Sequence, residues 1–135
     1  MKVLHITASI DESAGGPSRS VPKTCIELAK LGVDIEIITQ PSPNPVKIPK
    51  NENLKLVYKS IRALNTLGSN LKKADVDLIH IQHIWNPYVN VMAYWARKKN
   101  IPYIITPRGM LEPWILACNP WKKKLGMWLY QNTAI

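Results

Sequence analysis

The stretch from residue 9 to residue 19, SIDESAGGPSR, separates an expected strand at Lys2–Ala8 from an expected amphipathic helix. A strand that leads through a loop into a helix is the first part of a βαβ unit, and such units build parallel sheets. The adjacent Gly15 and Gly16 let backbone N–H groups approach a ligand closely, and a helix N-terminus behind them favours anions. The stretch therefore indicates an α/β fold with a ligand loop after its first strand, although a Gly-Gly turn alone is more often only a turn.

Four more segments have the apolar composition of short strands. They are Val33–Thr39, Leu54–Tyr58, Asp77–Gln82 and Ile101–Thr106. Leu54–Tyr58 alternates in polarity, which is typical of a strand at a sheet edge. The proline-rich and asparagine-rich segment before it, residues 41–53, predicts a surface loop.

Helical periodicity fills the intervals between these strands. Pro17 suits the first turn of a helix, Pro22 is expected to kink that helix or delay its regular part, and Gly32 ends it. A second helix is capped by Ser60 and a third begins at Asn86 and Pro87. Their expected apolar faces are Ile61, Leu64, Gly68 and Leu71 in the second helix, and Tyr88, Val91, Met92 and Trp95 in the third.

The element order is βαββαβαβ followed by a helical tail. It predicts one Rossmann-like, doubly wound α/β domain over residues 1–135, with a mainly parallel sheet of strand order 3-2-1-4-5 and flanking helices. In this order the first and fourth strands are neighbours, and a crevice opens between their carboxyl ends. We expect the glycine loop on one side of the crevice and His83, Trp85 and Asn86 on the other. Arg108 and Gly109, which follow the fifth strand, are expected next along the same edge.

The glycine pattern argues against the common nucleotide sites of such folds. The dinucleotide fingerprint GxGxxG is absent, and the second strand ends in Ile38-Thr39-Gln40 without the carboxylate that would bind a ribose. The phosphate-binding motif GxxxxGK[ST] is absent as well.

The charge distribution indicates anionic partners. The formal net charge is +9, and after Asp77 seven arginines or lysines face a single acid, Glu112. Such a basic half suits phosphorylated ligands, anionic lipid or nucleic acid. Nucleic acid is the weakest of these, because no basic strand with interleaved aromatics and no recognition motif is present.

The cysteines and the N-terminus indicate a cytoplasmic location. Cys25 and Cys118 have neither metal-ligand nor CxxC spacing, and Cys25 falls on an apolar helix face, so a reducing compartment is expected. Residues 1–10 lack the apolar run and cleavage site of a signal peptide, and no segment is long enough to span a membrane.

Three motifs, GGPSRSV, DLIHIQHIWNP and ITPRGMLEPW, occur in that order and together resemble the N-terminal domain of glycosyltransferase family 4. The resemblance implies a GT-B enzyme with two Rossmann-like domains, which transfers sugar from a nucleotide-sugar donor with retention and without a metal ion. It implies that Gly15 and Gly16 form the donor diphosphate loop, while a saccharide or lipid-linked acceptor occupies the cleft. The acceptor-side residues would be Ser18, Arg19, His83, Trp85, Asn86, Arg108 and Gly109.

Two departures from the family pattern matter. Arg108 occupies the position at which many relatives have a histidine; an arginine cannot act as a base, but it can pair with a phosphate or a sugar carboxylate. The chain also ends at Ile135, so we expect a truncated product without its donor-binding domain, which would be inactive alone and leaves the catalytic residues unknown. The alternative function is a noncatalytic α/β module that binds a nucleotide or a phosphorylated ligand.

The tail, Pro120–Ile135, carries an apolar stripe beside three lysines. The stripe is Trp121, Leu125, Trp128 and Leu129, and the lysines are Lys122, Lys123 and Lys124. Packing on the sheet or on the missing domain is one explanation. Contact with the inner face of an anionic membrane is the other.

Overall fold

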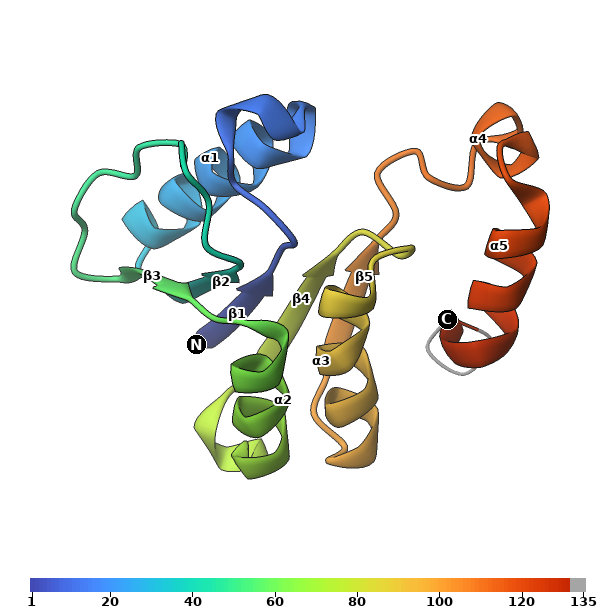
Figure 1. The fold of residues 1–135 in the computed structure, drawn as a ribbon. Helices are drawn as coiled ribbons and strands as arrows, with labels where there is room; N and C mark the ends of the chain where they lie inside the picture. The colour runs from blue at the N-terminus through green and yellow to red at the C-terminus, as the bar shows by residue number, and fades with distance from the viewer. Residues whose placement is uncertain (132–135) are drawn as a thin grey trace.

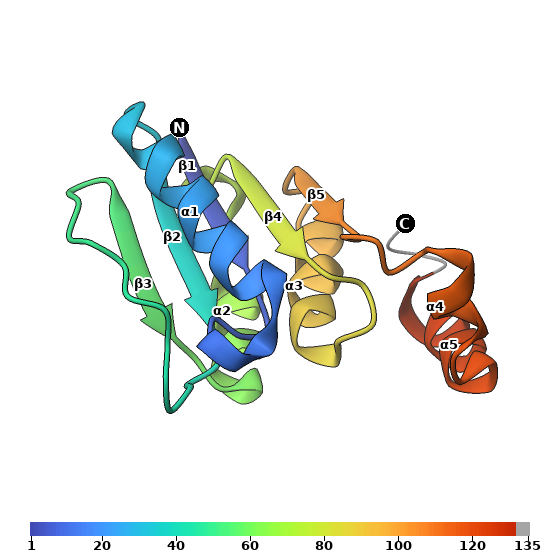
Figure 2. The ribbon, with the colours of Figure 1, turned by 90° about the horizontal axis from the view of Figure 1, so that it is seen from above.

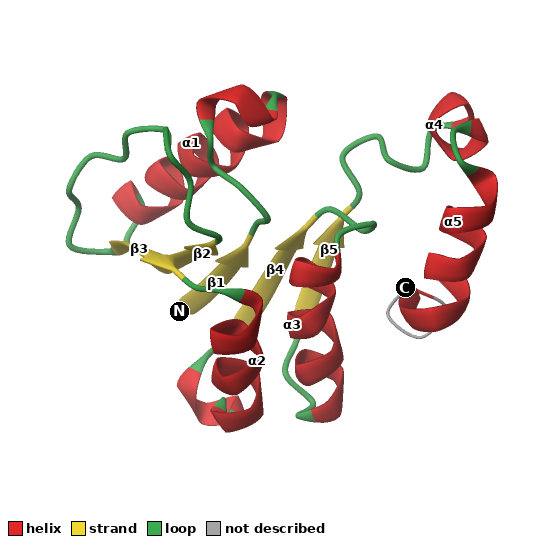
Figure 3. Cartoon of the chain, in the orientation of Figure 1, coloured by secondary structure: helices red, strands yellow, loops and turns green. Residues whose placement is uncertain are grey.

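The structure, a computed structural model that describes residues 1–131, contains one five-stranded parallel sheet in the order β3-β2-β1-β4-β5 (Figures 1 and 3). The strands are β1 (Lys2–Ile6), β2 (Asp34–Thr39), β3 (Leu54–Tyr58), β4 (Leu78–Gln82) and β5 (Tyr103–Thr106). The predicted strand order and the edge position of Leu54–Tyr58 are confirmed. Four of the predicted strands extended one or two residues too far at one end.

Helices cover both faces of the sheet. On one face lies α1 (Gly16–Lys30), and on the other lie α2 (Ile61–Asn70) and α3 (Pro87–Lys98) (Figures 1 and 2). Two 3-10 turns, η1 (Glu12–Ala14) and η2 (Lys73–Asp75), complete the connections within this part of the chain. The doubly wound α/β prediction is therefore confirmed.

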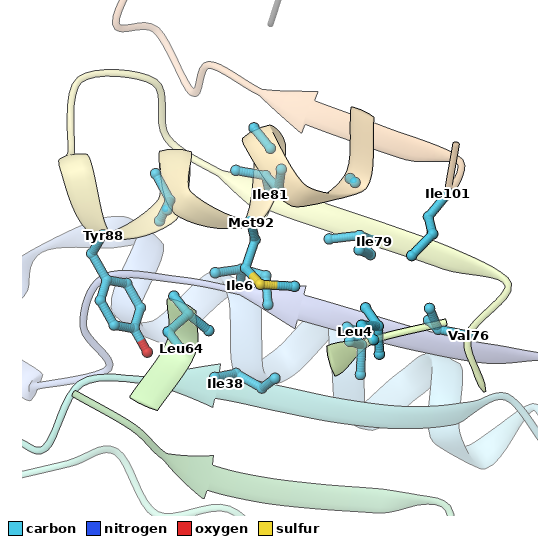
Figure 4. Packing of buried hydrophobic residues seen from close by; sticks show 14 residues of the cluster. Leu4, Ile6, Ile38, Leu64, Val76, Ile79, Ile81, Tyr88, Met92 and Ile101 are labelled. Carbon is cyan, nitrogen blue, oxygen red and sulfur yellow. The ribbon is translucent and has the colours of Figure 1, made fainter. Parts of the chain in front are cut away.

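The larger core lies between the sheet and the α2–α3 pair. Alternate residues of the central strands point to this side, so that Ile6 of β1 and its register partners Ile38 and Ile81 meet Met92 and Tyr88 of α3 (Figure 4). All five side chains are buried. Burial of this kind of side chain contributes roughly 1.5–3 kcal/mol each, so this layer supplies most of the hydrophobic stabilisation of the fold.

A smaller core lies under α1. It contains Val21 and Cys25 of the helix and Ile35 and Ile37 of β2, which confirms the prediction that Cys25 is a core residue. The helix is continuous from Gly16 through Pro22, so the expected late start was wrong. Pro22 lies inside the helix and is buried, although a proline has no N–H to donate to the carbonyl four residues before it.

Helices α2 and α3 approach closely at Gly68. A Cβ placed on Gly68 would lie 2.4 Å from Cδ1 of Trp95, whose ring nitrogen Nε1 donates a hydrogen bond to Oδ1 of Asn65 at 2.8 Å. Ser60 caps α2 as predicted, by accepting a hydrogen bond from the Ala63 N–H. Ile61, the first residue of α2, was predicted on the buried face but is 42% exposed.

The C-terminal segment lies beyond β5, apart from the sheet, in both views (Figures 1 and 2). It consists of α4 (Pro113–Ala117), α5 (Pro120–Gly126) and a π-helical turn, η3 (Met127–Gln131). Trp121 is 64% exposed and Trp128 is 73% exposed, so packing of the stripe on the sheet is wrong for these side chains. The end of the expected helix, residues 132–135, lies outside the described residues. None of the described helices has the length and apolarity required to cross a membrane.

Candidate functional site

Three loops meet at the carboxyl ends of the parallel strands. They are the glycine loop after β1 (residues 7–15), the histidine loop after β4 (residues 83–86) and the arginine loop after β5 (residues 107–112). Strands β1 and β4 are hydrogen-bonded neighbours, as predicted, so their loops border a common space. A pocket of about 420 Å³ opens there. It is lined by Ala8, Ser9, Ala14, Pro17, Ser18, His83, Trp85, Asn86, Pro87 and Met110.

The pocket brings together four of the nine residues predicted for the site: Ser18, His83, Trp85 and Asn86. The other five surround it without lining it. Gly15, Gly16 and Arg19 are exposed at the start of α1, and Arg108 and Gly109 belong to the arginine loop. Residues from both sides of the predicted crevice therefore line one space.

The two glycines of the glycine loop have different backbone conformations. Gly15 has φ 88°, in the region that disfavours side chains, and is the N-cap residue of α1. Gly16 is the first residue of the helix and does not share this positive φ. A Cβ at either position would meet no atom within 4 Å, so the protein leaves open space above both.

Asp11 holds the glycine loop against the loop that precedes β3. Its Oδ1 accepts hydrogen bonds from the Ser13 N–H at 3.0 Å and the Ser13 hydroxyl at 2.5 Å. Its Oδ2 accepts from the Ser42 hydroxyl at 2.5 Å and the Asn44 N–H at 3.1 Å. These bonds, that from the Ser13 side chain first, hold the pKa of Asp11 well below its usual range. Sequence reasoning missed Asp11, although an aspartate two residues before a serine is a signal for a side-chain-capped turn.

His83 presents a neutral imidazole to the pocket. Its backbone has φ 81° and its N–H donates to the Thr106 carbonyl at 3.1 Å, which fixes the start of the histidine loop. Positive φ in a non-glycine residue costs energy and is concentrated at functional sites. Burial, and then the charge of Arg108, lower the pKa of His83. Its Nδ1 is buried and has no hydrogen-bond partner among the described residues.

Asn86 and Trp85 complete the histidine loop. Oδ1 of Asn86 accepts a hydrogen bond from the Tyr88 N–H at 2.9 Å and caps α3, as predicted. This leaves the amide NH₂ of Asn86 without a partner in residues 1–131. The indole Nε1 of Trp85 donates to the Met110 carbonyl at 3.2 Å, so Trp85 ties the histidine loop to the arginine loop.

Arg108 links three elements by hydrogen bonds to neutral groups. Its Nε donates to Oε1 of Gln82 at 2.7 Å and its Nη1 donates to the Ser20 hydroxyl at 3.0 Å, while its backbone has φ 50°. Within residues 1–131 no carboxylate forms an ion pair with this guanidinium. Burial lowers the pKa values of His5, His80 and His83, and the positive charge of Arg108 adds to this lowering.

Two further histidines lie side by side on β1 and β4. The rings of His5 and His80 have centroids 4.7 Å apart, and Nε2 of His80 is 2.7 Å from the Thr106 hydroxyl. Burial, then the neighbouring His80 and Arg108, lower the pKa of His5 from 6.5 to about 4. Neither histidine lines the pocket.

The described residues contain no group of three or more histidine, cysteine, aspartate or glutamate side chains that could hold a metal ion. The polar side chains that line the pocket include the hydroxyls of Ser9 and Ser18, the imidazole of His83 and the amide of Asn86. Such groups can bind the hydroxyls of a sugar, while the guanidinium at the rim suits a phosphate or a carboxylate.

Comparison with known proteins identifies a matching family and solved structures of similar fold. The sequence pattern of the family described as Glycosyltransferase Family 4 matches residues 14–134. A solved structure of a short-chain dehydrogenases/reductase (ethylated) from Veillonella parvula DSM 2008 is similar, with a TM-score of 0.62 and 14% identity. The alignment covers 97% of this chain and 62% of that one, and at this identity it shows a shared Rossmann-like fold alone. No curated protein matches the chain.

Proposed function

Because the chain belongs to glycosyltransferase family 4, we propose that it is the acceptor-side half of a glycosyltransferase. In this proposal residues 1–135 form the N-terminal domain of a GT-B enzyme, and a second domain binds the nucleotide-sugar donor. The sugar moves with retention to a saccharide or lipid-linked acceptor. The observation that carries the proposal is that the motif residues Ser18, His83, Trp85 and Asn86, distant in sequence, line one pocket at the carboxyl edge of the sheet.

The glycine loop is assigned to the donor diphosphate. The open space above Gly15 and Gly16 supports this role, because a phosphate can reach the backbone there without meeting a side chain. The 15-residue helix α1 begins at the same point, and a helix N-terminus favours negative charge.

The pocket itself is assigned to the acceptor. The amide NH₂ of Asn86 has no partner among the described residues and can bond to an acceptor hydroxyl, and the imidazole of His83 lines the same pocket. A neutral His83 suits this role, because a neutral imidazole nitrogen can accept as well as donate. The indole of Trp85 offers an apolar surface for a sugar ring.

The rim residues Arg19, Arg108 and Gly109 are assigned to phosphate or to a sugar carboxylate. For Arg108 the support is its fixed orientation and the absence of an ion-pair partner in residues 1–131. Gly109 has φ 77° and shapes the arginine loop. We further propose that transfer needs no metal ion or other cofactor, and that the enzyme acts in the cytoplasm, in peripheral contact with anionic membrane.

The proposal is tested by supplying a donor-binding domain of a family 4 transferase in the same polypeptide and measuring transfer of labelled sugar from a panel of nucleotide sugars. Transfer is expected from the joined protein and not from the 135-residue chain alone. Trp85→Ala should reduce it, whereas Tyr94→Ala, at an exposed position of α3 outside the pocket, should not. Binding of a phosphorylated ligand without transfer would favour a noncatalytic module instead. Salt-dependent binding of RNA or DNA homopolymers would favour a nucleic-acid function.

A further inference from the structure

The glycine loop also pairs with the segment that follows β2. We call residues 41–46 of that segment the strap. The N–H of Glu12 donates to the Asn44 carbonyl at 3.0 Å, and the N–H of Val46 donates to the Ile10 carbonyl at 2.8 Å. The strap and the glycine loop therefore form a short antiparallel pair, although α1 and β2 separate them in the sequence.

Asp11 connects the strap to the part of the glycine loop that reaches the site. Its Oδ2 accepts two hydrogen bonds from the strap, from the Ser42 hydroxyl at 2.5 Å and from the Asn44 N–H at 3.1 Å. Its Oδ1 accepts from the Ser13 N–H and so caps η1, the turn that leads into Gly15. Hydrogen bonds to a carboxylate are roughly twice as strong as those between neutral groups. The strap is therefore linked to the backbone before Gly15 through a single side chain.

Ser9 lines the pocket from the glycine loop, and Asp11 orients its hydroxyl. The Oγ of Ser9 accepts a hydrogen bond from the Asp11 N–H at 3.0 Å. A hydroxyl also has one hydrogen to donate, and within residues 1–131 the hydroxyl hydrogen of Ser9 has no acceptor. The hydroxyl can therefore donate to a ligand, and an anionic oxygen is the acceptor that forms the strongest bond with it.

From these contacts we propose that Ser9 donates to a phosphate oxygen of the nucleotide sugar, and that Asp11 and Ser42 are positioning residues that act through the glycine loop. The proposal rests on the proposed function, in which the glycine loop binds the diphosphate. It adds to the site the strap, a segment that lines no part of the pocket. A purely structural contact would stabilise the fold without affecting what the glycine loop binds.

The test uses the ¹⁵N-labelled 135-residue chain and inorganic pyrophosphate, which stands for the diphosphate of the nucleotide sugar. The amide signals of Gly15 and Gly16 should move as pyrophosphate is added at constant ionic strength. Ser9→Ala and Ser42→Ala should each weaken the binding about fivefold, which corresponds to about 1 kcal/mol. Ser42→Thr keeps a hydroxyl at this position and should bind pyrophosphate as the parent does.

A matched control removes a serine hydroxyl elsewhere in the chain. Ser69→Ala in α2 deletes the hydrogen bond from the Ser69 hydroxyl to the Thr66 carbonyl, and it should leave pyrophosphate binding unchanged. Ser42 is a better test position than Asp11, because Asp11→Asn would also change the net charge of the chain. The indole signal of Trp95, a residue of α3, reports the fold of each variant.

Hydrogen exchange of backbone amides gives a second readout that needs no ligand. The Glu12 and Ser13 amides should exchange faster in Ser42→Ala, because the groups that accept their hydrogen bonds are held less firmly. The Ile79 amide of β4 should keep its exchange rate. Denaturant titration measures the stability of the whole chain, so release of the glycine loop is distinguished from general unfolding.

The positioning role is overturned if Ser42→Ala binds pyrophosphate as tightly as the parent does, or if Ser69→Ala weakens the binding to the same extent. Equal exchange rates in Ser42→Ala and the parent would also refute it, whether or not pyrophosphate binds. Unchanged binding by Ser9→Ala would refute the phosphate contact of Ser9. No response of the parent up to about 10 mM pyrophosphate would instead refute the diphosphate assignment in the proposed function, and the exchange rates would then decide the role of Ser42 alone.

Discussion

The glycine loop and the arginine loop border the same pocket but are stabilised in opposite ways. The glycine loop is organised around a carboxylate at the surface, Asp11, which accepts four hydrogen bonds. The arginine loop is organised around a half-buried guanidinium, Arg108, which donates to Gln82 and Ser20. In the glycine loop the positive φ falls on Gly15, whereas in the arginine loop it also falls on Arg108, where it is costly.

The difference teaches how charge is used at this edge of the sheet. The carboxylate of Asp11 accepts its hydrogen bonds from groups within the protein, so its effect is to hold the glycine loop in place. The charge of Arg108 has no counter-charge among the described residues, so it acts on nearby histidines and on any anionic ligand. The glycine loop therefore supplies geometry, and the arginine loop supplies electrostatic potential.

The largest expected effect concerns the geometry of the glycine loop. In the joined enzyme, Gly16→Val should reduce kcat/KM at least about a hundredfold, on the order of 3 kcal/mol, because the side chain fills the space through which a diphosphate reaches the backbone. The stability of the fold against unfolding should change little, because Gly16 is exposed and its φ is not positive. Steady-state kinetics and thermal melting of one preparation measure the loss of activity and the change in stability together. Activity within tenfold of the parent would remove the glycine loop from the site.

The second prediction concerns the stability of the fold at acidic pH and its dependence on His5, a buried residue whose pKa the charge of Arg108 helps to lower. His5 has a pKa lowered from 6.5 to about 4, so below pH 6.5 the unfolded chain binds a proton that the folded chain does not. Stability should fall as the pH drops from 6.5 to 4, by about 3 kcal/mol from this residue, and then level off. Urea unfolding at several pH values measures it. If the stability of a His5→Leu variant falls with pH as steeply as that of the parent, the effect does not come from His5.

The third prediction separates the two glycines. Gly15→Ala should destabilise the fold by roughly 1 kcal/mol or more, because its φ of 88° disfavours a side chain. Gly16→Ala should stabilise it by roughly 0.5–1 kcal/mol, because alanine is preferred to glycine in a helix. Denaturant titrations of both variants provide the comparison. Equal shifts of the same sign would mean that the conformational difference between the two positions does not exist in solution.

The fourth prediction is that the glycine loop loses its contribution to stability at a lower pH than the region around His5 does. The folded-state pKa of Asp11 is lowered, so its contribution is present above the ordinary value near 4 and is lost as the pH falls below it. Asp11→Asn should lower Tm at pH 7 and should lose less stability than the parent between pH 4 and pH 2. Melting curves at the two pH extremes measure this. An unchanged Tm at pH 7 would show that the hydrogen bonds of Asp11 are not stabilising.

The smallest expected effect is on histidine titration. Replacement of Arg108 by glutamine removes a positive charge, and the pKa values of His83 and His80 should rise toward the ordinary value while burial keeps them below it. Histidine ring signals followed by NMR against pH give these values. Arg19→Gln, an exposed change outside the pocket, is the matched control and should leave them unchanged.

The sequence predicted the scaffold far better than the loops. Strand order follows from short apolar runs and helical periodicity, which are local properties, and the caps at Ser60 and Asn86 follow from side-chain chemistry. The bonds that Asp11 accepts from Ser42 and Asn44 and those that Arg108 donates join residues 26 to 88 positions apart, and no local pattern encodes such pairs. The exposed stripe at Trp121 was predicted as helical, but its surroundings depend on tertiary contacts that periodicity does not contain.

The contact between Gly68 and Trp95 has a consequence for how related sequences can diverge. A residue larger than glycine at position 68 would overlap the indole, whose own position is fixed by Asn65 and by its place on α3. The two positions should therefore change together: alanine or serine at 68 requires a smaller residue at 95, and a lineage that keeps the tryptophan keeps the glycine. A survey of homologues would reveal this as paired substitution. This paired substitution should not depend on the sugar that each enzyme transfers, because neither residue lines the pocket.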